Sequence, residues 1–260
     1  MRIIAVPFQH ESLEHSLMIA EHCKEVCENR GADIEYIFKA SFDKANRTSA
    51  NGKRGVGLEQ TMLDFTEMKQ QIPGLKILTD VHDVSQINKI KNIVDVIQIP
   101  AFLCRQTDLI QAACETDCVV NIKKGQFLAP WDVAGILSKT NGAKEVWITE
   151  RGTSFGYNTL VVDFTGILYM LERYDNPIVF DVTHSVQKPG GQGSSSGGNR
   201  DFVAPLARGA AAMGVDNFFL EVHDDPDNAP SDGPNMVMLE NFKQVIREID
   251  WHTNGVHHAK

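Results

Sequence analysis

One short segment of the sequence concentrates the residue types that bind phosphate and carboxylate groups. It runs from Lys39 to Ser49 and holds three cations among several hydroxyl and amide side chains. A lysine supplies a compact positive charge and an arginine supplies paired N–H donors, and both suit anionic oxygens. An exposed basic loop that binds no ligand is the alternative interpretation. The candidate ligands in this segment are Lys39, Ser41, Lys44, Asn46, Arg47 and Thr48.

Charged and polar side chains also follow five other apolar runs of the sequence. They stand at 80–82, 123–124, 150–151, 181–184 and 221–223. If each run is a parallel strand of a closed barrel, the carboxyl ends of the strands meet at one mouth, where barrel enzymes keep their active sites. The sequence therefore predicts an enzyme that binds one doubly anionic ligand or two anionic ligands, without naming the reaction.

Three residues in the last third of the chain could hold a metal ion. His184, Glu221 and Asp232 offer nitrogen and oxygen donors, a mixture that suits a borderline or hard divalent metal. Single His and Glu residues are more often structural, so a hydrogen-bonded network is the alternative. The five cysteines form no CxxC pair, and we expect small buried thiols, two pairs of them within helices, rather than a zinc site.

Eight β-rich runs alternate with helical stretches along the chain. This alternation predicts parallel strands joined by helices, and eight such units in 260 residues favour a single (β/α)8 TIM barrel, one domain over residues 1–260, rather than an open sheet. The expected strands span residues 2–9, 34–41, 76–81, 96–101, 119–123, 145–149, 178–183 and 217–222. The expected helices include residues 58–70, 107–115, 132–139, 202–213 and 238–249.

A segment rich in glycine and serine, residues 189–198, interrupts this pattern. Its sequence, PGGQGSSSGG, cannot pack a hydrophobic core and therefore predicts a loop. Because the segment follows an expected strand at the barrel mouth, it is either a mobile lid over the site or a plain linker.

The composition limits the class of protein. The formal net charge is −9 and 42% of the residues are hydrophobic, values that are ordinary for a globular chain. An acidic total argues against nucleic acid as a partner, and no apolar run is long enough to span a membrane. Reduced thiols fit a cytoplasmic compartment. A small anionic substrate remains suitable, because a site can differ in sign from the whole chain.

Several long motifs resemble the 3-deoxy-D-manno-octulosonate 8-phosphate synthase family. They include FKASFDKANRTS at 38–49, NIKKGQFLAPWD at 121–132 and DVTHSVQKPGG at 181–191. The resemblance implies a (β/α)8 barrel and a homotetramer. It also implies that phosphoenolpyruvate condenses with arabinose 5-phosphate, with release of phosphate, to give the phosphorylated sugar acid of lipopolysaccharide.

The resemblance further implies roles for individual residues. Lys44, Asn46 and His184 are implied as catalytic residues, and either His184 or a metal-bound water would activate the attacking water. Phe102 and Arg105 are implied to reach the site of a neighbouring subunit. The family pattern assigns phosphoenolpyruvate to Lys39, Ser41, Lys44, Lys123 and Arg151, assigns the sugar phosphate to Asn46, Arg47 and Thr48, and places Asp80 and Gln98 in the lining of the site.

A sister family is the closest rival. It makes a seven-carbon product from erythrose 4-phosphate and typically carries Lys-Pro-Arg-Thr where this chain has Lys44-Ala-Asn46-Arg47. The sequence therefore favours the arabinose enzyme. A barrel that binds sugar phosphates without catalysis is a third alternative, and the cations retained at every site position argue against it.

The resemblance breaks at the first strand. Metal-dependent members of the family carry Cys, and metal-independent members carry Asn, at the position where the alignment puts Phe8. One interpretation is a metal-free site in which His184, Glu221 and Asp232 form a hydrogen-bonded network. Alternatively His10, expected on the same strand face as Phe8, replaces the missing ligand, or activity is impaired. We expect the metal-free site, and a divalent metal is the alternative cofactor.

Overall fold

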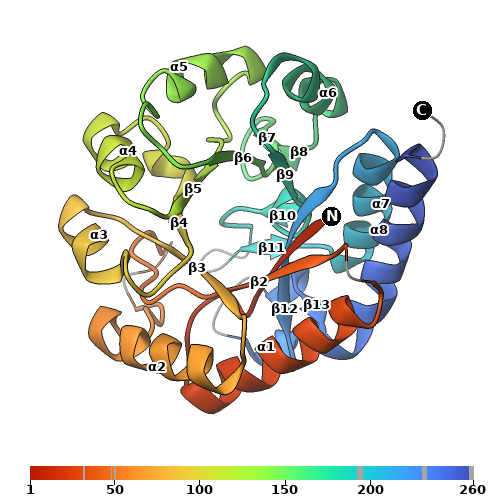
Figure 1. Ribbon diagram of the computed structural model, residues 1–260. Coiled ribbons are helices and arrows are strands. Elements are labelled where there is room, and N and C mark those ends of the chain that lie inside the picture. Colours follow the sequence, from red (N-terminus) through yellow and green to blue (C-terminus); the bar gives the residue numbers. More distant parts are fainter. Residues whose placement is uncertain (32, 48, 50, 192–195, 230–232, 258–260) are drawn as a thin grey trace.

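Eight parallel strands close into a barrel in a computed structural model that describes residues 1–31, 33–47, 49, 51–191, 196–229 and 233–257 (Figure 1). The barrel closes because β1 pairs with β12, with Arg2 opposite Asn217. This arrangement confirms the predicted (β/α)8 barrel. Its strands are β1 (Arg2–Val6), β2 (Glu35–Lys39), β3 (Lys76–Asp80), β4 (Val96–Ile99), β5 (Val119–Lys123), β6 (Val146–Glu150), β9 (Ile178–Asp181) and β12 (Asn217–His223).

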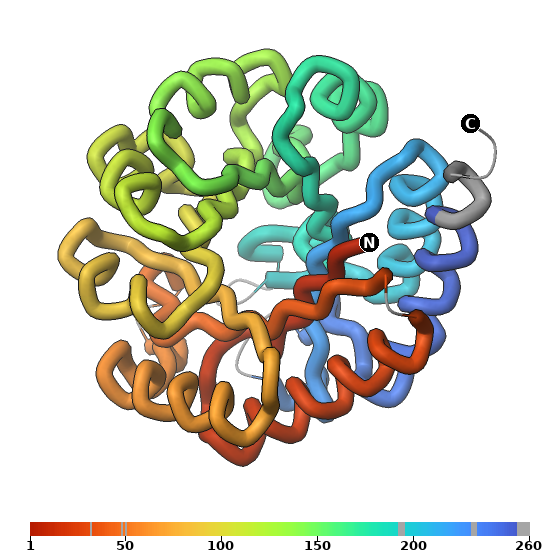
Figure 2. Tube along the Cα trace, viewed as in Figure 1, coloured from red at the N-terminus to blue at the C-terminus, as the bar shows by residue number. Residues whose placement is uncertain are grey.

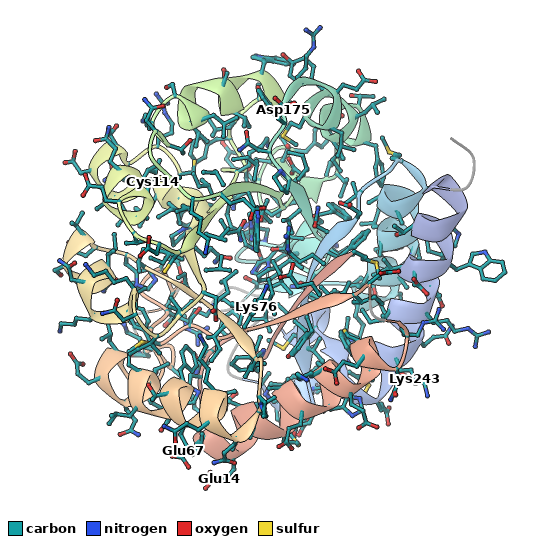
Figure 3. The ribbon with its side chains drawn as sticks, in the orientation of Figure 1. Glu14, Glu67, Lys76, Cys114, Asp175 and Lys243 are labelled. Carbon is teal, nitrogen blue, oxygen red and sulfur yellow. The ribbon has the colours of Figure 1, made fainter. Side chains whose placement is uncertain are left out.

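A ring of helices surrounds the strands. Each helix turns its apolar side chains toward the barrel, and α8 buries Phe242, Ile246 and Ile249 in this way. The charged side chains of Glu14 and Glu67 project outward from the ring (Figure 3). The helices are α1 (Leu13–Glu28), α2 (Leu58–Gln71), α3 (Val84–Ile90), α4 (Thr107–Cys114), α5 (Val133–Leu137), α6 (Phe164–Arg173), α7 (Val203–Ala212) and α8 (Phe242–His257).

Two predicted elements have different bounds in the structure. The first strand ends at Val6 rather than at residue 9, because Pro7 has no N–H for the ladder and Phe8 adopts a left-handed backbone with φ of +72°. The last helix spans Phe242–His257 rather than residues 238–249. It starts later because Met238 lies in the short strand β13 (Val237–Met238), which pairs with β12. The ends of the other predicted elements shift by at most two residues.

The interior of the barrel changes character along its axis. Successive side chains of a strand point to opposite faces, so residues two apart share a face. One cluster of buried apolar residues comes from the strands alone: Ile4, Val6, Ile37, Leu78, Val96, Trp147, Val179 and Phe219. Two residues after five of these positions stand the polar residues Lys39, Asp80, Gln98, Asp181 and Glu221. The last inward position of these strands is therefore polar, and it lies at the carboxyl end of the barrel.

The two ends of the barrel differ. At the amino end, the guanidinium of Arg2 lies 3.9 Å from the centre of the Trp147 ring and pairs with Glu35 at 2.8 Å. The first strand, red in Figure 2, runs beside blue β12, so the loops that follow these two strands meet at the carboxyl end. In the described part of the chain, no helix is long and apolar enough to cross a membrane.

All five cysteines are buried and free of disulfides, as predicted. Cys23 and Cys27 both lie in α1, whereas α4 ends at Cys114, so Cys118 lies outside the helix that the spacing predicted. Burial raises the pKa of Cys27 to about 12 and that of Cys114 to about 11. These thiols are protonated at neutral pH, which makes them poor nucleophiles and metal ligands.

Candidate active site

A pocket opens at the carboxyl end of the barrel, where the strands deliver their polar inward side chains. It gathers most of the residues that the sequence predicted, from loops and strands far apart in the chain. Residues of the predicted site that line this pocket are Phe8, Lys39, Lys44, Asn46, Arg47, Asp80, Gln98, Phe102, Lys123, Arg151 and His184. Thr48 and Asp232 lie outside the described residues.

Lys39 at the end of β2 is held by an acidic partner from β3. Its Nζ donates to Ser41 Oγ at 2.9 Å and lies 3.5 Å from Asp80 Oδ1, while Ser41 donates to Asp80 as well. Burial alone would raise the pKa of Asp80, but the charge of Lys39 and the hydrogen bond from His82 hold it well below its usual range. Ser41 stands behind Lys39, among the fully buried residues, and does not line the pocket.

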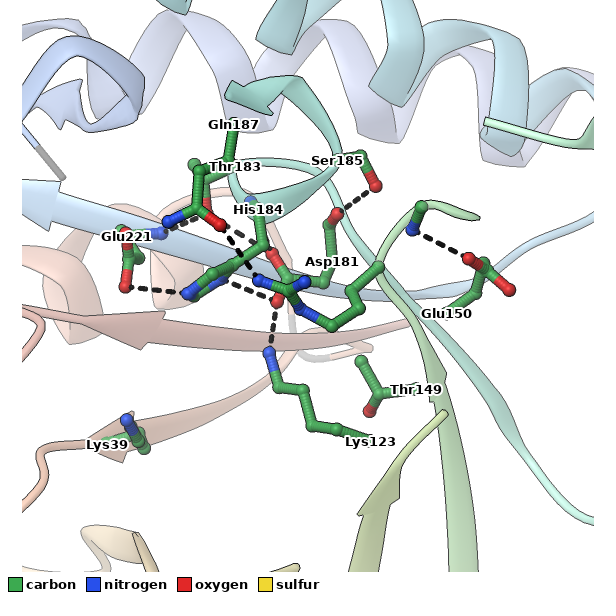
Figure 4. A network of polar contacts seen from close by, with 12 residues as sticks. Lys39, Lys123, Thr149, Glu150, Asp181, Thr183, His184, Ser185, Gln187 and Glu221 are labelled. Atoms are coloured by element: carbon green, nitrogen blue, oxygen red, sulfur yellow. Dashed lines mark hydrogen bonds and ion pairs between the residues drawn. The ribbon is translucent and has the colours of Figure 1, made fainter. Parts of the chain in front are cut away.

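A second buried network joins β5, β9 and β12 (Figure 4). Lys123 Nζ donates to Asp181, and the same carboxylate lies 2.8 Å from His184 Nδ1, while His184 Nε2 faces Glu221 Oε1 at 3.4 Å. Burial lowers the pKa of Lys123 to about 8, although Asp181 works in the opposite direction. Lys123 therefore carries its charge at neutral pH and loses it in mild alkali.

Two aromatic rings support the cations of the pocket, and the sequence analysis did not recognise the first of them. Phe219 lies beneath Lys123, with 3.4 Å from Nζ to the ring centre, and 5.9 Å from Lys39. It occupies the inward position before Glu221 on β12, a signal that strand alternation could have revealed. An aromatic face attracts a cation electrostatically, and the attraction grows when water is excluded.

Phe8 is the second ring, and its backbone is strained. Its φ of +72° is an outlier for a bulky side chain, yet the residue is only 5% exposed. The ring centre lies 3.8 Å from Lys44 Nζ and 5.0 Å from Arg47 Cζ. The next residue, Gln9, accepts a hydrogen bond from Arg47 Nη2 at 3.1 Å. The segment after β1 thus positions two cations of the pocket.

Arg151 and a loop hairpin close another side of the pocket. Arg151 Nη2 donates to Gln187 Oε1 at 3.1 Å. Gln187 lies in β10 (Gln187–Lys188), just before the predicted lid, and β10 forms a small antiparallel hairpin with β11 (Gly197–Gly198), the last two residues of that segment. Residues 192–195 of this segment lie outside the described residues. Pro189 and Ser196 of the predicted lid segment also line the pocket, and the lining residues that the sequence analysis missed are Pro100, Ala101, Gln126, Gln187 and Phe219.

The described residues do not form the metal site that the family pattern allows. His184 and Glu221 supply two donors, and both ring nitrogens of His184 already face carboxylates. Phe8 places a hydrocarbon ring in the pocket at the position where a donor is needed. Asp232 lies outside the described residues. Among the described residues, a metal ion at this site would therefore find only two donors, His184 and Glu221.

His10 does not replace the missing ligand. The prediction that it shares a strand face with Phe8 is wrong, because β1 ends at Val6. Its ring is fully buried, with Nε2 2.6 Å from Asp64 Oδ2 and Nδ1 2.8 Å from Ser16 Oγ. His10 anchors the segment after β1 to α1 and α2 and lies outside the pocket lining.

The two residues implied to cross to a neighbouring subunit lie differently in this chain. Phe102 borders the pocket of its own chain and is 60% exposed. Arg105 is exposed and does not line that pocket. Both follow β4, and the exposed ring of Phe102 leaves apolar surface at the rim of the mouth.

Comparisons with known proteins identify related sequences. The family model described as the DAHP synthetase I family matches residues 1–255. A curated protein of Nitrobacter hamburgensis, 2-dehydro-3-deoxyphosphooctonate aldolase, is 53% identical over 251 residues, which cover 96% of this chain and 86% of the relative. Proteins of the same name from Agrobacterium fabrum (52% identical; 95% and 87% covered) and Caulobacter vibrioides (53%; 96% and 86%) are similar to the same extent.

Proposed function

The chain belongs to the DAHP synthetase I family, and from this premise we propose that it condenses phosphoenolpyruvate with D-arabinose 5-phosphate and water. The products are 3-deoxy-D-manno-octulosonate 8-phosphate, a precursor of lipopolysaccharide, and inorganic phosphate. The observation that carries the proposal is one pocket that collects five cations, Lys39, Lys44, Arg47, Lys123 and Arg151. Relatives at about half identity bear the name of the octulosonate enzyme.

The first substrate is a polyanion and needs several fixed charges. Lys39, Lys123 and Arg151 bind the carboxylate and phosphate of phosphoenolpyruvate, because they reach the pocket from β2, β5 and the end of β6. Asp80 and Asp181 hold the two lysines in place. Charges that are fixed before the substrate arrives offset its repulsion without reorganisation during the reaction.

The second substrate binds on the Phe8 side of the pocket. Lys44, Asn46 and Arg47 follow β2 and line that side. Arg47 takes the sugar phosphate through its planar pair of donors, and Lys44 stands between the two substrates. Holding both anions in one pocket brings C3 of the enol to the aldehyde carbon, which removes most of the entropic cost of a bimolecular step.

Bond formation then requires proton transfers that the pocket can serve. C3 of phosphoenolpyruvate bonds to the aldehyde carbon, whose oxygen gains a proton, and water adds to C2 before the C2–O bond to phosphate breaks. We assign the proton of this water to His184, because His184 lines the pocket and the carboxylates of Asp181 and Glu221 stabilise the imidazolium that forms. We propose that the reaction proceeds without a metal ion.

The choice of aldose phosphate tests the proposal. Phosphate release from phosphoenolpyruvate is measured with arabinose 5-phosphate, with erythrose 4-phosphate and with neither. We expect turnover with the five-carbon sugar at least about tenfold above that with the four-carbon sugar, a difference of 1.4 kcal/mol in transition-state binding. The reverse order identifies the sister activity. If no phosphate is released in the presence of either sugar, the protein is a non-catalytic barrel that binds sugar phosphates.

Chelation tests the metal-free reaction. After exhaustive treatment with EDTA, turnover stays within about twofold of the untreated enzyme, since the catalytic groups are side chains. Loss of turnover that Zn²⁺ or Mn²⁺ restores would show that the catalytic site holds a metal.

The site also bears on assembly and compartment. We propose a homotetramer in the cytoplasm in which Phe102 and Arg105 of one subunit approach the pocket of another. The exposed ring of Phe102 at the pocket rim supports a covered interface there, and five unoxidised thiols suit a reducing compartment.

A further inference from the structure

Two histidines and a glutamate form a second cluster beside the barrel, apart from the pocket. Glu11 precedes α1, His15 lies in its first turn, and His223 ends β12. One donor atom from each lies within 4.8 Å of the others, and this is the only such group of three found among the described residues. None of the three lines the pocket.

We propose that Glu11, His15 and His223 bind a divalent metal ion of the zinc class, a site that is separate from catalysis and goes beyond the proposed function. The ion ties the start of α1 to the end of β12. Two histidine nitrogens and one carboxylate oxygen are a ligand set that zinc accepts, with a water in the fourth position.

The spacing of the donors suits such an ion. Two ligands of a tetrahedral zinc ion lie about 3.3 Å apart when each bond is near 2.0–2.1 Å. Glu11 Oε1 and His223 Nε2 are separated by 3.2 Å. The rings of His15 and His223 have centres 4.8 Å apart and are tilted by 49°, so they approach without stacking face to face.

Asp224 supplies His15 with the outer support that metal-binding histidines usually have, because its Oδ1 lies 2.9 Å from His15 Nε2. His223 Nδ1 accepts the backbone N–H of Asp225 at 3.0 Å, and an ion on Nε2 would require Nδ1 to donate instead to Asp224 Oδ1, which lies 3.2 Å away. A carboxylate that accepts the far N–H of a histidine fixes the ring and makes the other nitrogen a better donor. In the described part of the chain His15 Nδ1 is buried and has no hydrogen-bond partner, so this nitrogen is available to an ion.

The charges of the cluster also favour a bound cation. Glu11 and Asp224 carry two negative charges, and in the described residues neither forms an ion pair with a lysine or arginine. Their partners are the two histidines, which are neutral when they bind metal. The side chains of His15 and His223 are 17% and 8% exposed. A divalent ion would neutralise this half-buried group.

The helix cap sets the geometry of the site. The Ser12 side chain accepts a hydrogen bond from the His15 backbone N–H at 3.2 Å, which fixes where α1 begins. Glu11 directly precedes this cap residue, and His15 lies in the first turn that follows it. The pairing of β1 with β12 then places His223 opposite.

Metal binding by the whole enzyme is the test. Protein stripped with EDTA is titrated with Zn²⁺, and with Co²⁺ as a visible probe of the ligand set. We expect about one ion per chain, and a higher melting temperature with Zn²⁺ than without. The visible spectrum of the Co²⁺ form should show the absorption of a four-coordinate ion. Turnover is expected to be the same for the stripped and the loaded protein.

Variants locate the ion. Glu11→Gln and His15→Gln are each expected to weaken Zn²⁺ at least about tenfold, and Asp224→Asn about tenfold through lost support. His22→Gln, on the same helix, is the matched control and keeps the affinity. Folding of each stripped variant is checked by circular dichroism, and Glu11→Gln preserves the shape of the side chain.

Three outcomes would overturn the proposal. The first is wild-type protein that binds less than a tenth of an ion per chain, in which case hydrogen bonds alone hold the cluster together. The second is unchanged affinity in both Glu11→Gln and His15→Gln. The third is an ion that is lost in His184→Gln but kept in His15→Gln, because it would then belong to the catalytic pocket.

Discussion

Phe8 shows how a single residue alters the electrostatics of the pocket. A hydrocarbon ring cannot ligate an ion, but its face can hold a cation, and here it lies against Lys44 and near Arg47. The residue keeps a left-handed backbone at a cost of about 1–3 kcal/mol, which the buried anchor of His10 helps to sustain. The ring therefore supports two cations that we propose to bind the anionic substrates.

Removing the aromatic face is expected to weaken substrate binding. Phe8→Leu keeps an apolar side chain of similar size but loses a cation–π contact worth about 0.5–2 kcal/mol. We expect the KM for arabinose 5-phosphate to rise by about 3- to 30-fold with kcat changed less. Phe8→Tyr is the control and stays near the wild type. Equal KM values for Phe8→Leu and wild type would refute this role.

The ionisation of Lys123 is expected to produce the alkaline limb of the pH profile of kcat/KM. The lysine is charged below its pKa of about 8 and neutral above it, and only the charged form attracts an anion. kcat/KM for phosphoenolpyruvate should therefore fall as the pH rises through about 8. Bound phosphoenolpyruvate favours the charged form, so the limb in kcat lies at higher pH. Lys123→Arg stays charged and should lose the limb near 8; the same limb in that variant would contradict the assignment.

At the scale of elements, the hairpin of β10 and β11 depends on a close approach of two backbones. β11 packs against the loop after β12, where Asn235 Nδ2 donates to Gly197 O at 3.4 Å. A Cβ on Gly198 would lie 1.5 Å from Asn235 Oδ1, so only glycine fits. The hairpin in turn carries Gln187, which holds Arg151. A glycine in the loop thus acts on a cation in the pocket.

Gly198→Ala is expected to move the hairpin and with it Arg151. A shift of about 1 Å at a positioning group can cost up to about a hundredfold in rate, so we expect kcat/KM to fall at least tenfold. The melting temperature should fall by only a few degrees, because the barrel core is untouched. The matched control is Gly135→Ala in α5, where a Cβ meets nothing within 4 Å. Wild-type kinetics in Gly198→Ala would count against the hairpin.

The whole molecule separates its charges. The chain carries a formal charge of −9, and acidic side chains such as Glu14 and Glu67 face outward. Five cations gather in the pocket, each at the end of a strand or in the loop that follows one. Large apolar rings also lie open to solvent near the mouth: Phe102, Phe127, Trp131 and Phe155 are all more than half exposed. We propose that neighbouring subunits cover part of this surface.

The proposed tetramer can be tested by the mass of the protein in solution. We expect a sedimentation mass of about four times the 28.9 kDa chain. If Arg105 serves a neighbouring pocket, then Arg105→Ala and Lys39→Met chains are each nearly inactive but recover part of the activity when they are unfolded and refolded together. Mixed chains that remain as inactive as the two parents would show that each pocket is complete within one subunit.

The sequence by itself determined the barrel, since eight apolar runs alternating with helices have few other ways to bury their faces. It also indicated many of the residues that meet at the mouth, because polar residues such as Lys39 and Asp80 follow their strands directly. Only the tertiary structure decided the partners of His10 and the place of Phe8, since Pro7 ends the strand before either residue. It alone brought Glu11 and His223 together, because 212 positions separate them in the chain and the closure of β1 on β12 makes them neighbours.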